Sequence, residues 1–284
     1  MGSISAANAE FCFDLFRELK PQHINENIFY SPLSIISALA MVYLGTRGNT
    51  ALQVEKCGEP KGIHFKFKDL LSEINSHSAN YSLRMVNRLY AENTYSILPV
   101  KTKPVQMMHQ AGFFKIASIG SEKIHILELP YANEELSMII LLPNDISDLD
   151  QLENTINFDK LMAWTSSTNM RKRKVEVYLP RMKLEEQYSL APVLSSLGMT
   201  DLFTQSADLS GISTGKNLAV SEVIHKSHVE INEEGTEAAA ATGVTIVLMS
   251  HVFPIKFKAD HPFLFFIHHK KTNLILFYGR FSSP

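Results

Sequence analysis

Hydrophobic residues recur at helical spacing along the first part of the chain. Between residues 5 and 19, Phe11 and Leu15 belong to an apolar stripe that repeats every three to four positions. This spacing predicts an amphipathic helix. Residues 34–44 are apolar almost all round, which predicts a buried helix. Residues 63–74 again have apolar side chains on one side of a predicted helix.

Further along the chain, short apolar or alternating runs predict strands. These runs are residues 82–92, 113–119, 124–129, 137–142, 175–180, 255–257, 263–268 and 274–278. Helical patterns at 149–164 and 191–197 interrupt them. Helices concentrated early and sheets later predict the α+β class. Because there is no Pro/Gly/Ser-rich linker and no repeat, we expect a single domain over residues 1–284.

The amino-acid composition limits the classes of function that the chain can have. A chain of 284 residues with 45% hydrophobic residues can bury a large core. Its net charge of −2 gives no reason to expect a nucleic-acid partner. Two cysteines cannot form a disulfide framework or a metal cluster, so no metal and no cofactor are expected. No apolar run reaches membrane-spanning length, and no cleavable signal peptide is recognised.

Two surface features leave alternatives open. The basic run Arg171–Lys174 precedes the alternating strand pattern. Such a run is usually a solvated strand entry, and its second interpretation is a binding patch for heparin or another polyanion. Asn80 begins an Asn-Tyr-Ser sequon, which is a glycosylation acceptor if the chain enters the secretory path and otherwise an unmodified turn.

An unusual run of small residues lies near the C-terminal end. Four alanines, Ala238 to Ala241, stand between Glu237 and Thr242. Alanine favours helix, yet Gly235 precedes the run and β-branched residues follow it. A segment that can be loop, helix or strand suits a conformational switch. Its small side chains would also offer little obstruction to entry between two strands.

With the apolar C-terminal segments Phe257–Ile267 and Phe277–Arg280, this run resembles the reactive loop and closing strands of a serpin. The segment Asn27–Ile35, followed by Ala38–Gly45, is similar to the second helix of the ovalbumin-like branch. The residues around Phe11 to Asp14 are similar to its first helix. The resemblance implies a serpin fold, with three β-sheets, a helical cluster and an exposed reactive loop at about residues 233–254.

The chain departs from the family pattern after about residue 100. Residues 97–100 run directly into residues 101–108, which look like a much later strand. In the family, two helices and two strands of the main sheet lie between them. The missing block should include a central strand beside the gap where the reactive loop inserts, and a tryptophan. Trp164, the only tryptophan, lies in a predicted helix, so we expect an incomplete main sheet.

The resemblance implies a bait mechanism. A protease cleaves the loop, and the freed loop inserts into the main sheet and traps the acyl-enzyme. The hinge of inhibitory serpins is small, as it is here at Gly235, Thr236, Glu237, Ala238, Ala239, Ala240, Ala241 and Thr242. Family spacing from Glu233 places the scissile bond between Met249 and Ser250, which suits an elastase- or chymotrypsin-like serine protease. A slip of one residue would make Leu248 the bait, and an exposed loop without a target is the alternative.

Further residues of this chain match individual functional positions of the serpin family. Glu233 and Arg181 match a charge pair that restrains premature opening of the sheet. Ser31, Ser34 and His225 match a polar cluster under the main sheet, whose asparagine partner would lie in the missing block. The alternative for His225 is a buried histidine with one hydrogen bond.

A catalytic role has little support. Ser221 lies four residues before His225, and His261, His268 and His269 follow. The chain has no G-x-S-x-G elbow, no H-E-x-x-H and no phosphate-binding glycine loop. We therefore predict that the protein is not an enzyme.

The sequence predicts a monomeric serine protease inhibitor of serpin type, in the extracellular space or cytoplasm. The alternative is a non-inhibitory or truncated serpin-like protein that acts as a protease substrate, storage or binding protein. The small-residue hinge favours the inhibitor, and the missing block favours the non-inhibitory protein. We expect this form to inhibit poorly.

Overall fold

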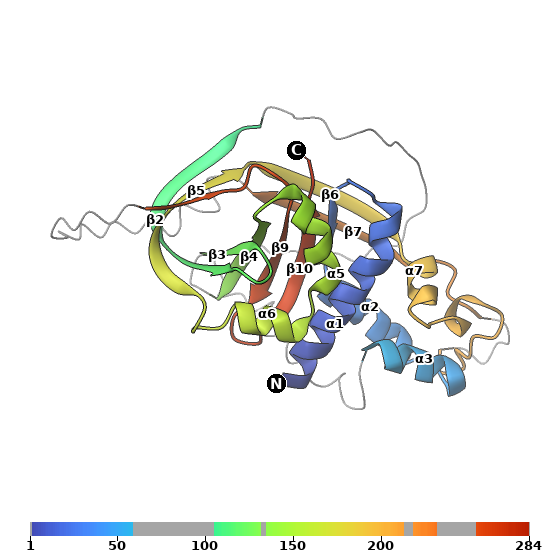
Figure 1. Cartoon of the computed structure of the whole chain (residues 1–284). Helices are drawn as coiled ribbons and strands as arrows, with labels where there is room; N and C mark the ends of the chain where they lie inside the picture. The colour runs from blue at the N-terminus through green and yellow to red at the C-terminus, as the bar shows by residue number, and fades with distance from the viewer. Residues whose placement is uncertain (1, 59–104, 132–134, 213–217, 232–253, 284) are drawn as a thin grey trace.

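The helices gather on one side and at one end of a large twisted sheet (Figure 1). The structure, a computed structural model, describes residues 2–58, 105–131, 135–212, 218–231 and 254–283. Its helices are α1 (Gly2–Leu19), η1 (Lys20–Gln22), α2 (Pro32–Tyr43), α3 (Gly48–Gly58), η3 (Ile146–Asp148), α5 (Leu149–Thr155), α6 (Phe158–Trp164), α7 (Ala191–Ser196) and η4 (Asp201–Phe203). The predicted segments 63–74 and 82–92 lie outside the described residues.

The strands form two hydrogen-bonded sheets within the described chain. They are β1 (Ile28–Tyr30), β2 (Met107–Ile119), β3 (Ile124–Pro130), β4 (Leu136–Pro143), β5 (Arg171–Pro180), β6 (Met182–Ser189), β7 (Ile224–Ile231), β8 (Ile255–Lys258), β9 (Phe263–His269) and β10 (Leu274–Phe281). The large sheet has the order β1-β10-β9-β4-β3-β2-β5-β8, and the small sheet is β6-β7.

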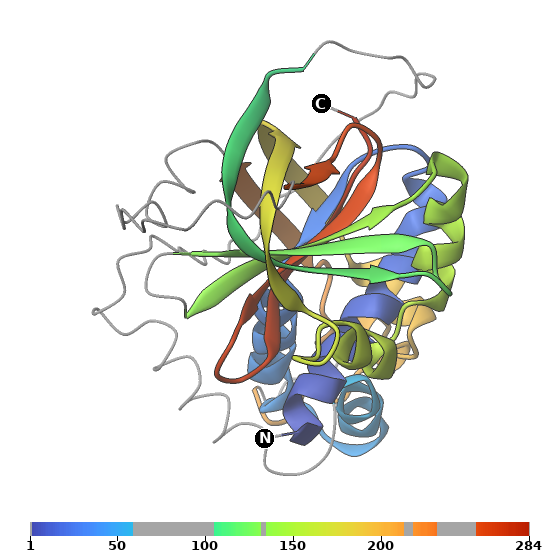
Figure 2. The ribbon, with the colours of Figure 1, turned by 60° about the vertical axis from the view of Figure 1, so that its left-hand side comes forward.

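Strand β2 explains why two sheets appear where three were expected. Its thirteen residues pair with β5 along 107–116 and with β3 along 115–119. The strand therefore runs from one expected sheet into the next and joins them by continuous hydrogen bonding. Figure 2 shows its long curve beside β5.

The core lies on both faces of the large sheet. On the first face, Ile139 and Phe266 pack in a cluster with α1, and the rings of Phe13 and Phe16 meet Tyr278 edge-on at 5.7 and 5.2 Å. On the second face, Ile140 belongs to a separate cluster with residues of β5 and β6. A strand covered on both faces favours apolar residues on both sides, which is why β4 and β9 are mostly apolar, with Ser137, His268 and His269 as their polar members.

The described helices and strands confirm most of the pattern-based predictions. The predicted helix 149–164 is divided, because Ile156 is extended and Asn157 caps α6 by accepting a hydrogen bond from the Lys160 amide at 2.9 Å. The helix predicted as buried over 34–44 is buried along its first part and exposed near its end: Met41 is 61% exposed, and Leu44, which follows α2, is 63% exposed. Strands β1, β6 and β7 and helix α3 were not predicted.

Candidate functional site

The two strands that flank the expected reactive loop belong to different sheets. Strand β7 ends at Ile231 in the small sheet, and β8 begins at Ile255 at the edge of the large sheet. The segment between them therefore joins the two sheets. The expected hinge, bait bond and glycosylation residues lie outside the described residues: Glu233, Gly235 to Thr242, Met249, Ser250 and Asn80.

Within the described residues, β6 is the only strand that pairs with β7 in a sheet. The register is antiparallel, with Met182 opposite Ile231 and Ser189 opposite Ile224. The sheet that leads into the loop thus has two strands in the described part of the chain. The predicted strand 82–92 lies outside the described residues, so the expectation of an incomplete main sheet stays a prediction here.

Arg181 lies at the end of the small sheet where the chain leaves for the loop. It precedes Met182, which pairs with Ile231, the last residue of β7. Its backbone N–H donates to the Gln106 carbonyl at 2.9 Å, and its Nη1 donates to the Gln106 side chain at 3.4 Å. Because Glu233 is outside the described residues, the Glu233–Arg181 pair stays a prediction.

The predicted polar cluster comes together under the small sheet. The Ser31 amide donates to His225 Nε2 at 3.0 Å, and the Ser31 hydroxyl donates to the Leu276 carbonyl at 2.7 Å. The same hydroxyl oxygen accepts from the Ser34 amide at 3.2 Å and caps α2. All three predicted residues are buried. The cluster therefore connects β7, the start of α2 and β10.

The His225 ring is held in its neutral form. Burial lowers the pKa of His225 to about 4. Because Nε2 accepts a hydrogen bond from a backbone amide, the ring proton is on Nδ1. These contacts are consistent with both interpretations of His225. It is a member of a polar cluster, and it is also a buried histidine with a hydrogen bond.

Sequence reasoning missed two residues that extend the cluster. Tyr188 of β6 accepts a hydrogen bond from the Phe29 amide at 3.0 Å, and Ser227 of β7 donates to the Phe29 carbonyl at 2.5 Å. Side chains from both strands of the small sheet thus bind the backbone of β1. The available signal was the alternation along β7, which places His225 and Ser227 on the same buried face.

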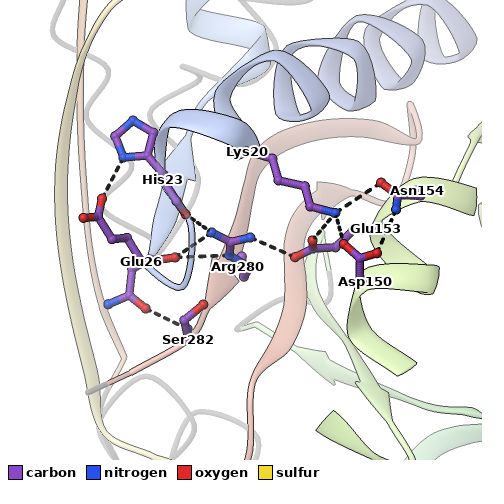
Figure 3. A network of polar contacts seen from close by, with 9 residues as sticks. Lys20, His23, Glu26, Asp150, Glu153, Asn154, Arg280 and Ser282 are labelled. Carbon is purple, nitrogen blue, oxygen red and sulfur yellow. Dashed lines mark hydrogen bonds and ion pairs between the residues drawn. The ribbon is translucent and has the colours of Figure 1, made fainter. Parts of the chain in front are cut away.

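A second polar network fixes the C-terminal strand (Figure 3). Arg280 of β10 is buried, and its Nη1 lies 3.1 Å from Glu153 Oε1 of α5. Its guanidinium also donates to the carbonyls of His23 and Glu26 in the loop after η1. The other Glu153 oxygen lies 2.9 Å from Lys20 Nζ. The network joins three parts of the chain that are distant in sequence.

The histidines considered for catalysis have separate contacts. His225 accepts from a backbone amide, while Ser221 is exposed. His261 contacts Asp260 and the Pro143 carbonyl, and His269 contacts Thr272. In the part of the chain that the structure describes, no three His, Cys, Asp or Glu side chains are grouped to hold a metal. No described helix is long and apolar enough to cross a membrane.

The chain belongs to the serpin family. The family model, described as serpin (serine protease inhibitor), matches residues 6–100 and 98–284. Ovalbumin of Dromaius novaehollandiae is 43% identical, and ovalbumin-related protein Y of Gallus gallus and Serpin B8 of Homo sapiens are each 39% identical. Each match spans 100% of both chains. The chain is thus similar to the ovalbumin-like serpins, as its sequence predicts.

Solved structures show the same fold. Uncleaved ovalbumin aligns with a TM-score of 0.84 at 38% identity, covering 99% of this chain and 100% of that chain. A loop-inserted, cleaved ovalbumin mutant aligns at 0.83 with 36% identity and the same coverage. A tumour-suppressing serpin aligns at 0.86 with 27% identity, covering 100% of both chains. The α+β serpin fold is therefore confirmed.

The comparisons also confirm the internal loss. The alignment with Dromaius ovalbumin spans 388 positions, against 284 residues in this chain, so at least 104 positions have no counterpart here. The two segments matched by the family model meet at residues 98–100. This is the junction that the sequence indicates.

Proposed function

We propose that this chain presents residues 233–254 as bait to an elastase- or chymotrypsin-like serine protease, which cleaves the Met249–Ser250 bond. Family membership supports a bait loop. The flanking strands support its position, since β7 and β8 fix the ends of this segment in two different sheets. Such a protease would meet the chain in the extracellular space, or in the cytoplasm if it is released from granules.

The protease serine would attack the Met249 carbonyl, form an acyl-enzyme and release Ser250 as a free amine. Water then hydrolyses the ester unless the loop inserts first and distorts the protease. Insertion requires a strand on each side of the incoming segment, because a central strand makes hydrogen bonds along both of its edges. A segment that pairs with β7 alone would make only one of these two ladders.

One observation favours hydrolysis of the acyl-enzyme over trapping of the protease. In the described residues, β7 has β6 as its only partner strand, and the family match is broken at residues 98–100. We therefore propose that the acyl-enzyme hydrolyses and the chain leaves as a cleaved substrate. The small hinge favours the second candidate, a trapping inhibitor, and the experiment below separates the two.

The cleaved chain should stay in one piece until it is denatured. Residues 250–284 include β9 and β10, and both strands have hydrogen-bonded neighbours on each side in the large sheet. Buried Arg280 holds the same segment to α5. Cleavage must therefore be followed under denaturing conditions.

The test is incubation of the full chain with pancreatic elastase and with chymotrypsin, followed by denaturing gel electrophoresis and mass spectrometry. We expect a fragment that begins at Ser250 and no high-mass band. Met249→Asp is the control, because a carboxylate does not suit the apolar specificity pocket of either protease. An SDS-resistant complex would establish trapping in place of release. An intact loop under both proteases would overturn the bait proposal itself.

A further inference from the structure

His261 lies in the turn between β8 and β9, next to the end of β4. The antiparallel register places Leu141 opposite Leu264, so Pro143, the last residue of β4, lies beside this turn. The distance from His261 Nε2 to the Pro143 carbonyl oxygen is 2.7 Å, and the distance from Nδ1 to Asp260 Oδ1 is 3.0 Å. The side chain is 17% exposed. The ring therefore bridges an oxygen of β4 and an oxygen of its own turn.

Both of these oxygens can only accept hydrogen bonds. A peptide carbonyl and an ionised carboxylate have no proton to donate. A neutral imidazole has one N–H, whereas the imidazolium has two. Whichever nitrogen carries the proton in the neutral ring, the other nitrogen presents its lone pair to an oxygen. Only the protonated ring of His261 donates to both oxygens at once.

The Asp260 carboxylate stays ionised beside the ring. It pairs with Lys258 Nζ at 2.8 Å. Hydrogen bonds from Lys258 and from His261 hold the pKa of Asp260 below its ordinary value. A carboxylate with a lowered pKa keeps its charge through the range in which histidines titrate, between about pH 5 and pH 8. Asp260 is therefore an acceptor throughout this range.

A second carboxylate, that of Asp145, faces His261 from the turn after β4. Hydrogen bonds from Ser147 lower the pKa of Asp145, and the charges on His261 and Lys123 lower it further. Lys123, from the turn before β3, is paired with Asp148 at 3.0 Å. The ring thus lies between two carboxylates, and the lysine on this side already has a carboxylate of its own.

Strand β8 has few other attachments. It has four residues and lies at the edge of the large sheet, where β5 is its only partner among the described strands. Phe257 is the one buried residue of this strand. After the strand, the Ala259 amide donates to the Tyr178 carbonyl at 2.9 Å. The contacts of the adjoining turn therefore contribute much of what holds β8 in place.

We propose that His261 is a pH-dependent latch, whose imidazolium form ties the β8–β9 turn to the end of β4 and whose neutral form releases one of the two ties. Loss of one ring proton replaces an N–H donor by a lone pair that faces an oxygen. Because β8 begins where the expected reactive loop ends, the latch would set how firmly the C-terminal end of the loop is attached. The proposal holds whether or not the loop is cleaved.

The test is amide hydrogen exchange of the full chain, followed by NMR at about pH 5 and about pH 8 and corrected for the intrinsic exchange rate at each pH. The Ala259 amide is the reporter, because its hydrogen bond to Tyr178 lies between β8 and His261. The Ile156 amide, which donates to the Leu152 carbonyl at 3.0 Å, is the reference for changes in global stability.

We expect the protection of Ala259, relative to that of Ile156, to fall about five- to tenfold from the lower to the higher pH. This is the effect of losing one hydrogen bond that involves a charged group. A ratio that does not change with pH would overturn the proposal.

Two variants separate the latch from a merely structural role. His261→Gln removes the titrating group, so its ratio should not depend on pH. Asp260→Asn supplies an amide that can donate to the neutral ring, so high protection should persist at the higher pH. His228→Gln, at an exposed position of β7, is the matched control and should follow the unmodified chain.

Two results with these variants would also overturn the proposal. One is a pH-dependent ratio in His261→Gln, since another group would then be responsible. The other is a loss of protection at the higher pH in Asp260→Asn that equals the loss in the unmodified chain.

Discussion

At the scale of single residues, His225 shows how an ordinary side chain becomes specialised by its surroundings. Its ring lies under the small sheet and accepts a hydrogen bond from the Ser31 amide. Protonation would remove the acceptor and place a charge in a buried site, so burial lowers the pKa of His225 to about 4. The position thus couples β7 to the start of α2 only while the ring is neutral.

This coupling predicts a loss of stability in mild acid. Because the pKa is about 4 in the fold and 6.5 for an ordinary histidine, the unfolded chain binds the proton first as the pH falls. Stability is complete above about pH 6.5 and falls by up to roughly 3 kcal/mol as the pH approaches 4. Urea unfolding of wild type and His225→Gln from pH 4 to 8 measures it.

The contribution of His225 is the difference between these two pH profiles. We expect a flatter profile for His225→Gln, while His228→Gln, an exposed position on the same strand, should follow wild type. A wild-type profile for His225→Gln would contradict the prediction.

At the scale of elements, the buried ions connect segments that do not share a sheet ladder. Glu153 of α5 contacts Arg280 of β10 and Lys20 of η1, and both Glu153 and Arg280 are almost completely buried. Removing one member of a buried pair leaves an uncompensated charge, which is far more costly than losing an exposed pair.

We therefore expect Glu153→Gln to lower the free energy of unfolding by roughly 3–5 kcal/mol. Asp14→Asn is the control, since Asp14 forms an exposed ion pair with Arg17 at 2.7 Å. Its loss should cost less than about 1 kcal/mol. Chemical denaturation of the two variants measures both values, and similar losses would show that the buried network has no special role.

At the scale of the whole molecule, the two sheets differ in the number of strands that the described residues contribute. The large sheet has eight hydrogen-bonded strands, whereas the small sheet has two in the described residues. The first provides a stable support for β9 and β10. The second would have to accept the loop if the chain were a trapping inhibitor.

If insertion fails, cleavage should leave thermal stability nearly unchanged. We expect the Tm of the chain cleaved at Met249–Ser250 to lie within about 5 °C of the intact Tm, a difference of roughly 1–2 kcal/mol. Scanning calorimetry before and after protease treatment measures this difference. A rise of about 15 °C or more would mean that the freed loop adds a strand despite the missing block.

The pattern of the sequence was sufficient for the elements with a clear hydrophobic period. Helix α1 and strands β3, β4, β9 and β10 occur where apolar spacing predicts them. Strand β6 was not predicted, although buried Met182, Leu184 and Tyr188 alternate there with charged or polar residues. Strand β7 was not predicted, because it carries polar side chains on its buried face. A buried serine or histidine gives no hydrophobic signal, since only its hydrogen-bond partners make that position favourable.

For the candidate site, the sequence by itself determined the family and the place of the internal loss, and the family resemblance implied the cluster of Ser31, Ser34 and His225. Motifs and small-residue runs are local, so they can be read along the chain. The tertiary structure alone decided the role of Tyr188 and Ser227 and the Arg280–Glu153 pair. These depend on strand register and on contacts between residues more than a hundred positions apart, which the local pattern does not encode.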